Sequence, residues 1–99
     1  MLIPTPFPYT SLFVPIIAVF FGMVIRVFHS DHNPPHIHVE YGEYEAIVEI
    51  ESGAIITGKL PRRLERLVKE WLKERRKDVM KAWQDAREHK MPHRVKPLE

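Results

Sequence analysis

The sequence predicts an α+β fold, in which a small antiparallel meander of four to five strands is packed by one long C-terminal helix. Short runs of alternating apolar and polar residues, separated by glycine-containing turns, occupy the first sixty positions. From residue 61 the period changes to that of an amphipathic helix. A chain of 99 residues forms one domain with a modest core. We expect this domain over residues 14–90, after an irregular extension (1–13) and before a tail (91–99).

Five segments have the composition of strands, and the connections between most of them are short enough for hairpins. In one of them Met23, Ile25 and Val27 point to one face and Arg26 to the other, as a half-buried strand requires. The expected strands are residues 15–20, 23–28, 37–41, 44–50 and 54–57.

The helix is expected to begin after Pro61, a residue that suits the first turn. Its apolar stripe consists of Leu64, Leu67, Val68, Trp71, Leu72, Val79, Ala82, Trp83 and Ala86. A straight helix over residues 62–89 would be roughly 42 Å long, whereas a domain of this size is about 30 Å wide. We therefore expect either a bend or split near residues 75–78, or a distal part that leaves the body and packs on a partner, for example in a homodimer.

The N-terminal apolar run does not predict a membrane span. It covers residues 12–25, only fourteen positions, and contains Pro15 and Gly22, whereas a spanning helix needs about twenty apolar residues. A basic start and a small-residue cleavage site, which a secretory signal needs, are both missing. The absence of cysteine excludes disulfides and thiolate metal sites and is compatible with a cytoplasmic location.

Charge is distributed unevenly along the chain. Residues 1–60 hold two basic and six acidic residues, a net charge of −4, whereas residues 61–99 hold thirteen basic and seven acidic ones, a net charge of +6. Six basic side chains, which we call the basic ridge, lie opposite the apolar stripe of the helix: Arg62, Arg66, Lys69, Lys73, Arg76 and Lys77. Like charges four residues apart destabilise a helix slightly. The ridge is therefore either a surface for nucleic acid or an acidic partner, or an ordinary solvated face.

Four of the six histidines fall within residues 29–38, HSDHNPPHIH. His36 and His38 are two apart at the start of a strand, so their rings are expected on one face. His32 lies across the Pro34-Pro35 turn and can fold back toward them.

Three interpretations of this loop remain open. His32, His36 and His38, with Asp31, are a cysteine-free ligand set that suits zinc. Alternatively, the same imidazoles exchange protons near neutral pH while Arg26 stabilises a phosphate, which suits metal-independent phosphodiester chemistry. In the third interpretation the loop is a rigid turn whose histidines only bind backbone groups.

Two longer stretches, FFGMVIRVFHSDHNPPHIHVEYGEYEA and ESGAIITGKLPRRLERLVKEWLKERRKDVMKAW, resemble a family of small prokaryotic proteins that contain a domain of unknown function. The shared features are an FFG-x-x-I-R strand, a DH-x-PPH-x-H loop, a YGE turn, an LPRR helix start and two helical tryptophans. The resemblance covers residues 14–83. The residues that match it are Arg26, Asp31, His32, Pro34, Pro35, His36, His38, Tyr41, Gly42, Glu43, Arg62 and Arg63.

Members of that family are often encoded beside a second small protein, in an arrangement typical of type II toxin–antitoxin pairs. The resemblance therefore implies a cytoplasmic, toxin-like protein with a small antitoxin-like partner. We expect it to act on nucleic acid, with RNA favoured, as a metal-independent ribonuclease without a cofactor. The alternative is a non-enzymatic regulator that binds DNA or protein through the basic ridge.

These expectations assign roles to specific residues. The expected catalytic residues are Arg26, Asp31, His32, His36 and His38, with Asp31 orienting one ring. The expected residues that bind nucleic acid or a partner are Arg62, Arg63, Arg66, Lys69, Lys73, Arg76 and Lys77. If zinc is bound instead, its expected ligands are His32, His36 and His38.

Overall fold

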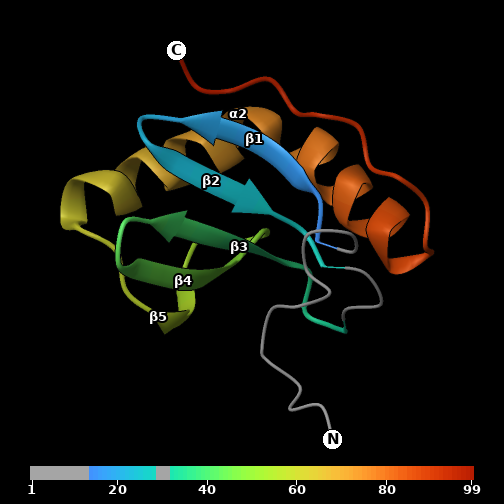
Figure 1. Ribbon diagram of the computed structural model, residues 1–99, viewed down its shortest axis with the longest axis horizontal. Helices are drawn as coiled ribbons and strands as arrows, with labels where there is room; N and C mark the ends of the chain where they lie inside the picture. The colour runs from blue at the N-terminus through green and yellow to red at the C-terminus, as the bar shows by residue number, and fades with distance from the viewer. Residues whose placement is uncertain (1–13, 29–31) are drawn as a thin grey trace, which may run out of the picture.

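Five strands pair in the order in which they occur in the chain, each antiparallel to the next (Figure 1). The computed structural model describes residues 14–28 and 32–99. The expected extension 1–13 and Asp31 lie outside these residues. The strands are β1 (Ile16–Phe20), β2 (Met23–Arg26), β3 (His36–Tyr41), β4 (Tyr44–Glu49) and β5 (Ile55–Gly58). The predicted antiparallel meander is confirmed.

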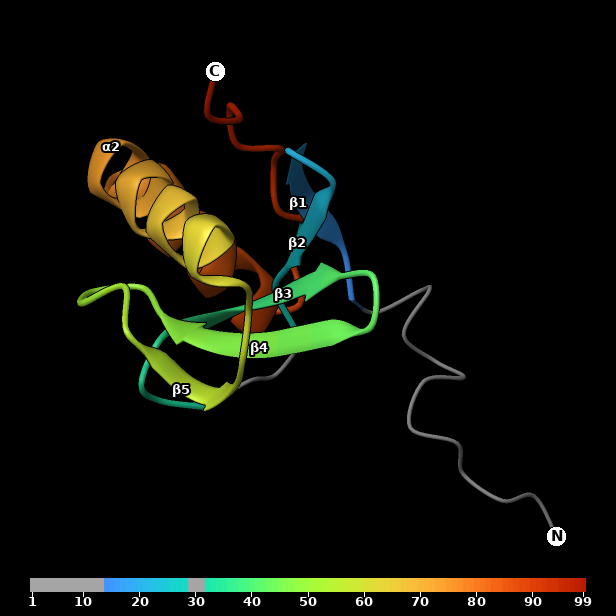
Figure 2. The same cartoon turned by 90° about the vertical axis from the view of Figure 1, so that its left-hand side faces the viewer.

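One long helix, α2 (Arg62–Arg87), covers a single face of the sheet (Figure 2). The strands turn alternate apolar side chains toward it, including Ile25, Ile37 and Val48, which are fully buried. The buried residues of the helix are Leu64, Val68, Trp71, Leu72, Val79, Ala82, Trp83 and Ala86. The core therefore lies between the helix and the sheet, and the polar residues of β2, β3 and β4, such as Arg26, Glu40 and Glu45, lie on the opposite face.

The helix bends at Arg75, whose φ of −120° and ψ of 21° are not helical. Beyond the bend, Val79 and Trp83 are still buried against the body of the protein. The predicted bend is therefore present, and it keeps the distal part of the helix on the sheet. A contact between two copies through this part would have to use its other side.

The segment after the helix is extended and packs back on the domain. Its Val95 N–H donates a hydrogen bond of 2.7 Å to the Ile17 carbonyl, beside strand β1. The Trp71 indole N–H donates another of 2.7 Å to the Lys96 carbonyl. Because Val95 and Leu98 are buried, this tail closes one edge of the core. In the described part of the chain, no helix is both long and apolar enough to cross a membrane.

The β1–β2 turn contains an unfavourable backbone conformation. Phe21 and Gly22 have φ values of 49° and 80°, as the two central residues of a type I′ hairpin turn require. Asparagine followed by glycine suits this turn best, and a bulky residue in the left-handed region loses about 1–2 kcal/mol. Phe21 therefore occupies a position where its side chain makes folding less favourable.

Gly58 has a more severe constraint, which leads to a prediction about stability. Its φ is 82°, and an added Cβ would overlap the Glu45 carbonyl oxygen on strand β4. We expect Gly58→Ala to lower the free energy of unfolding by about 2–5 kcal/mol, because backbone strain and a clash with backbone act together. Gly42→Ala is the control, because Gly42 has a φ of 56° with no atom within 4 Å of an added Cβ. It should lose only about 1–2 kcal/mol. Equal losses in urea denaturation would contradict the clash.

Candidate acid–base site and basic surface

A row of side chains crosses the open face of the sheet, the face that α2 does not cover. Arg26 on β2 lies opposite His38 on β3, and His38 lies opposite Ile47 on β4. Ile47 in turn lies opposite Thr57 on the edge strand β5. Directly opposite residues have Cβ atoms about 5 Å apart. The pairing therefore places the Arg26 and His38 side chains next to each other, although twelve residues separate them in the sequence.

The three histidines lie close together, with their rings in sequence from β3 into the preceding loop. The His36 and His38 ring centroids are 5.1 Å apart, and those of His32 and His36 are 6.4 Å apart. The His38 ring also stacks on Phe28, with centroids 3.8 Å apart and planes at 30°. The rings of His36 and His38 lie side by side, as their spacing predicts, and the loop brings His32 back toward them.

His36 is the most enclosed of the three, with 7% of its surface exposed. Its Nδ1 lies 2.7 Å from the Pro34 carbonyl oxygen. A carbonyl oxygen only accepts hydrogen bonds, so the proton of this bond belongs to Nδ1. This contact orients the His36 ring and ties the loop to the start of β3.

A pocket of about 180 Å³ opens on the same face beside His38. Its lining includes Phe28, His38, Glu40, Glu45, Ile47 and Thr57. The pocket therefore holds one imidazole and two carboxylates, groups that can give and accept protons. The Nε2 atom of His38 is shielded from solvent.

The two carboxylates in the pocket differ in their ion-pair partners. Glu40 and Glu45 lie opposite each other on β3 and β4, and like charges in this position destabilise a sheet. Arg26 compensates Glu40 through an ion pair of 3.2 Å from Nε to Oε2. Arg26 also donates from Nη1 to the Val14 carbonyl, 2.9 Å away. Within the described part of the chain, no ion pair holds Glu45.

The positions of the described histidines give no support to a zinc site in the loop. Among residues 14–28 and 32–99, no three His, Asp or Glu side chains are placed to hold a metal ion together. His32, His36 and His38 are therefore neighbours without a shared ligand geometry. The contribution of Asp31 lies outside the described residues.

The basic ridge lies on the other side of the molecule from the pocket, because α2 packs on the opposite face of the sheet (Figure 2). Arg62, Arg66, Lys69, Lys73 and Lys77 are exposed, and Arg76 is half-buried with its Nε 3.3 Å from the Ile50 carbonyl. Arg63 lies at the start of the helix, with its guanidinium carbon 5.8 Å from the centroid of the Phe21 ring. The structure thus brings Arg26 to the histidines but keeps the arginines of the helix away from them.

Sequence reasoning missed Phe28, Glu40, Glu45, Ile47 and Thr57 as neighbours of His38. A signal for two of them was present: Glu40 is two residues after His38, so it lies on the same face. The two-residue turn Gly42-Glu43 then places Glu45 opposite Glu40. Thr57 could not be located this way, because the pairing of β4 with β5 shifts in register between Ile47 and Val48. Counting residues back from the β4–β5 turn therefore does not place Thr57 opposite Ile47.

Residues 22–84 match the family described as "Domain of unknown function (DUF4160)". The chain belongs to this family. The DUF4160 segment contains the histidine loop, the pocket residues and all of the basic ridge. No curated protein is significantly similar to the chain. No solved structure is significantly similar to it either.

Proposed function

We propose that this protein cleaves single-stranded RNA without a metal ion, at the pocket beside His38. The observation that carries the proposal is the placement of His38 and Glu45 around one pocket, with Arg26 opposite His38 on the neighbouring strand. An acid, a base and a fixed cation are the groups that phosphodiester cleavage needs when no metal is used.

In the proposed reaction, the Glu45 carboxylate takes the proton of an RNA 2′-hydroxyl. The 2′-oxygen forms a bond to the adjacent phosphorus, and the bond from phosphorus to the 5′-oxygen breaks. The His38 imidazolium gives its proton to that leaving oxygen. The products are a 2′,3′-cyclic phosphate and a 5′-hydroxyl. The Arg26 guanidinium stabilises the charge that builds up on the phosphate oxygens.

His36 and His32 have a supporting role in this proposal. Their rings form a series from His38 to the exposed His32, with centroid separations of 5.1 and 6.4 Å. The buried His36 ring packs beside His38 and helps to hold its orientation. His36 is a positioning residue as well, because its contact with the Pro34 carbonyl holds the loop.

The biological part of the proposal rests on the resemblance described above. The protein is the toxin-like member of a type II toxin–antitoxin pair in a prokaryotic cell. It acts in the cytoplasm and is held inactive by a small antitoxin-like partner. Induced expression without the partner should then stop growth.

The chemical part is tested by incubating the purified protein with a labelled single-stranded RNA, with and without EDTA. We expect cleavage in both, and fragments that end in a 2′,3′-cyclic phosphate. DNA of the same sequence should stay intact, because it has no 2′-hydroxyl. Cleavage that EDTA abolishes, or equal cleavage of DNA, would exclude this reaction.

Glu45 provides a prediction that couples stability to activity. Glu45→Gln removes the like-charge pair with Glu40, so the free energy of unfolding should rise by about 0.2–1 kcal/mol. The same change removes the base, so the initial rate of RNA cleavage should fall by about 10²-fold or more. Glu49→Gln is the control, because Glu49 lies opposite His36 and is not part of the pocket lining. A Glu45→Gln variant with the wild-type rate would remove Glu45 from the mechanism.

A second candidate function is a non-enzymatic regulator that binds DNA or protein. The observation that favours it is the exposure of the ridge on the side away from the pocket. Lys69→Glu with Lys73→Glu should then weaken nucleic-acid binding by about 10-fold or more at low salt. The control is Lys90→Glu with Lys96→Glu, which makes the same charge change on exposed residues beyond the helix. Gel-shift titrations with duplex DNA compare the two, and equal losses would indicate a general charge effect.

A further inference from the structure

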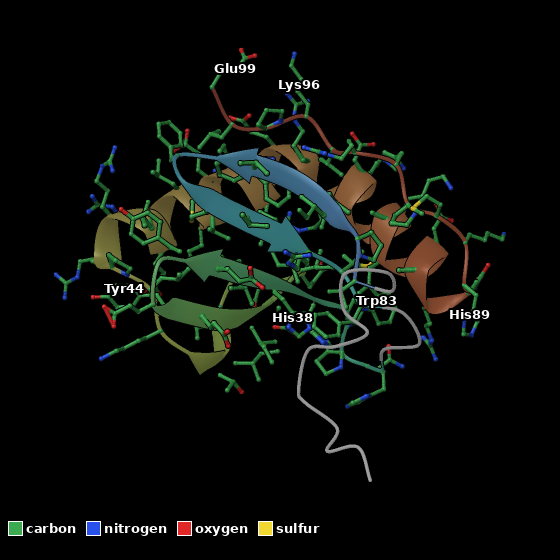
Figure 3. The ribbon with its side chains drawn as sticks, viewed as in Figure 1. His38, Tyr44, Trp83, His89, Lys96 and Glu99 are labelled. Atoms are coloured by element: carbon green, nitrogen blue, oxygen red, sulfur yellow. The ribbon has the colours of Figure 1, made fainter. Side chains whose placement is uncertain are left out.

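Two hairpin turns and the start of α2 lie at the same end of the sheet (Figure 1). Two large rings are exposed there: Phe21 in the β1–β2 turn by 46%, and Tyr44, which opens strand β4, by 38%. Figure 3 shows Tyr44 at this end, away from His38. We call this region the turn-end surface and define it as Phe21, Tyr41, Tyr44, Arg62 and Arg63.

Two pairs of side chains on this surface are close together, and the β1–β2 turn lies between them. The Arg63 guanidinium carbon lies 5.8 Å from the Phe21 ring centroid. A Cβ added to Gly22 would come within 3.1 Å of Tyr41 Cε1, so the first turn packs closely against the Tyr41 ring. Tyr41 and Tyr44 have parallel, offset rings with centroids 6.4 Å apart and planes at 29°. The surface thus combines an Arg63–Phe21 pair with a Tyr41–Tyr44 pair, and the backbone of Gly22 lies between them.

Folding does not explain the presence of Phe21. Its φ of 49° is unfavourable for a bulky side chain, and asparagine would suit this turn better. About half of the ring is left in water, so burial recovers only part of the loss. Residues that are unfavourable for stability are expected where a binding function needs them.

The charge around the pocket indicates what the turn-end surface binds. Within the five described strands, Arg26 is the only lysine or arginine and it is paired with Glu40, whereas β3 and β4 carry Glu40, Glu45 and Glu49. A polyanion is therefore not held by the open face of the sheet alone and needs cations from another part of the protein. Arg62 and Arg63 supply positive charge beside exposed rings, and bases of a single strand stack on aromatic side chains.

We propose that the turn-end surface binds single-stranded RNA, with bases stacked on Phe21 and Tyr44 and phosphates held by Arg62 and Arg63. This inference rests on the proposed function, since it describes how the substrate of the pocket is held. The charge also suits an acidic protein segment, but carboxylates alone give no role to the exposed ring faces. Binding at the turn end and chemistry at His38 are separate, so each can be lost without the other.

The test uses a fluorescein-labelled twelve-nucleotide single-stranded RNA whose riboses are all 2′-O-methylated, so that it binds but cannot be cleaved. We expect salt-dependent binding by the wild-type protein in fluorescence anisotropy. Phe21→Asn should weaken it by about 10-fold while the melting temperature stays at or above that of the wild type. Arg63→Gln, an exposed change that keeps the fold, should weaken binding by a similar factor. His93→Ala, a change at an exposed residue of the tail, should bind this RNA as the wild type does.

Several outcomes would overturn the inference. Unchanged binding by Arg63→Gln, or by a Phe21→Asn variant that melts normally, would remove these side chains from the RNA site. Polyglutamate and unlabelled RNA are then compared as competitors at equal charge. If polyglutamate displaces the labelled RNA as effectively, the surface binds an acidic protein partner and the inference fails. If the wild type binds the methylated RNA through these residues but cleaves no unmodified RNA, the inference stands and the proposed reaction fails. If the wild type cleaves unmodified RNA and the turn-end variants bind normally, the proposed reaction stands and the inference about the turn-end surface fails.

Discussion

Replacing His38 by alanine is expected to lower the rate of RNA cleavage by about 10²–10⁴-fold, the usual contribution of a general acid. The fold should survive, because His38 is only half-buried and its strand neighbours Ile37 and Val39 are the ones that enter the core. Initial rates on labelled RNA measure the first effect, and circular dichroism with thermal melting measures the second. In cells, induced expression of this variant should no longer stop growth.

Two further histidine variants sharpen this prediction. His36→Ala should also lose toxicity with the fold retained, because it removes the ring beside His38 and releases the Pro34 carbonyl. His93→Ala is the matched control, because His93 is exposed in the tail after the helix. Full toxicity of both His36→Ala and His38→Ala would exclude catalysis by the histidines.

Replacing Trp71 by alanine is expected to have the largest effect on stability, a loss of about 3–5 kcal/mol. The Trp71 side chain is fully buried, its ring centroid lies 5.1 Å from that of Phe20, and its N–H holds the tail at Lys96. Domains of this kind are stable by only about 5–15 kcal/mol. Much of that stability would be lost, and the denaturation midpoint in urea should fall accordingly.

The two tryptophans allow the hydrogen bond to be separated from packing. Trp71→Phe removes the bond to the Lys96 carbonyl and should release the tail, which limited proteolysis would detect near Val95. Trp83→Phe is the matched control, because the buried Trp83 indole nitrogen has no hydrogen-bond partner within the described residues. Removing an unpaired polar group should be the less damaging change. If Trp83→Phe lowers the free energy of unfolding more than Trp71→Phe does, packing contributes more to the stability at Trp71 than its hydrogen bond to the tail.

Much of the fold could be predicted because its causes are local. Alternation places Met23, Ile25 and Val27 on the buried face, and short glycine turns enforce antiparallel neighbours. The bend near Arg75 followed from the excess length of the helix and from a charged residue within its apolar stripe. The packing of Val95 and Leu98 was not predictable, because an irregular tail has no periodicity that reveals its contacts.

The candidate site could be predicted only in part. The spacing of two residues places His36 and His38 side by side, and the proline turn permits the approach of His32. Arg26 joins them because β2 and β3 pair in one particular register. The separation of the arginine pair Arg62-Arg63 from the histidines could not be read from their charges, since it follows from the direction of the strands and the side on which the helix packs.

The sequence by itself determined the strands, the amphipathic helix and the shared face of His36 and His38, and it left a bend of the helix as one of two alternatives. These features depend on the chemistry of neighbouring residues and on the periods of strand and helix. Only the tertiary structure decided that Glu40 and Glu45 join His38 at one pocket, that the basic ridge lies on the other side, and that exposed rings gather with Arg63 at the turn end. These relations join residues distant in sequence through strand register and packing, which no local pattern records.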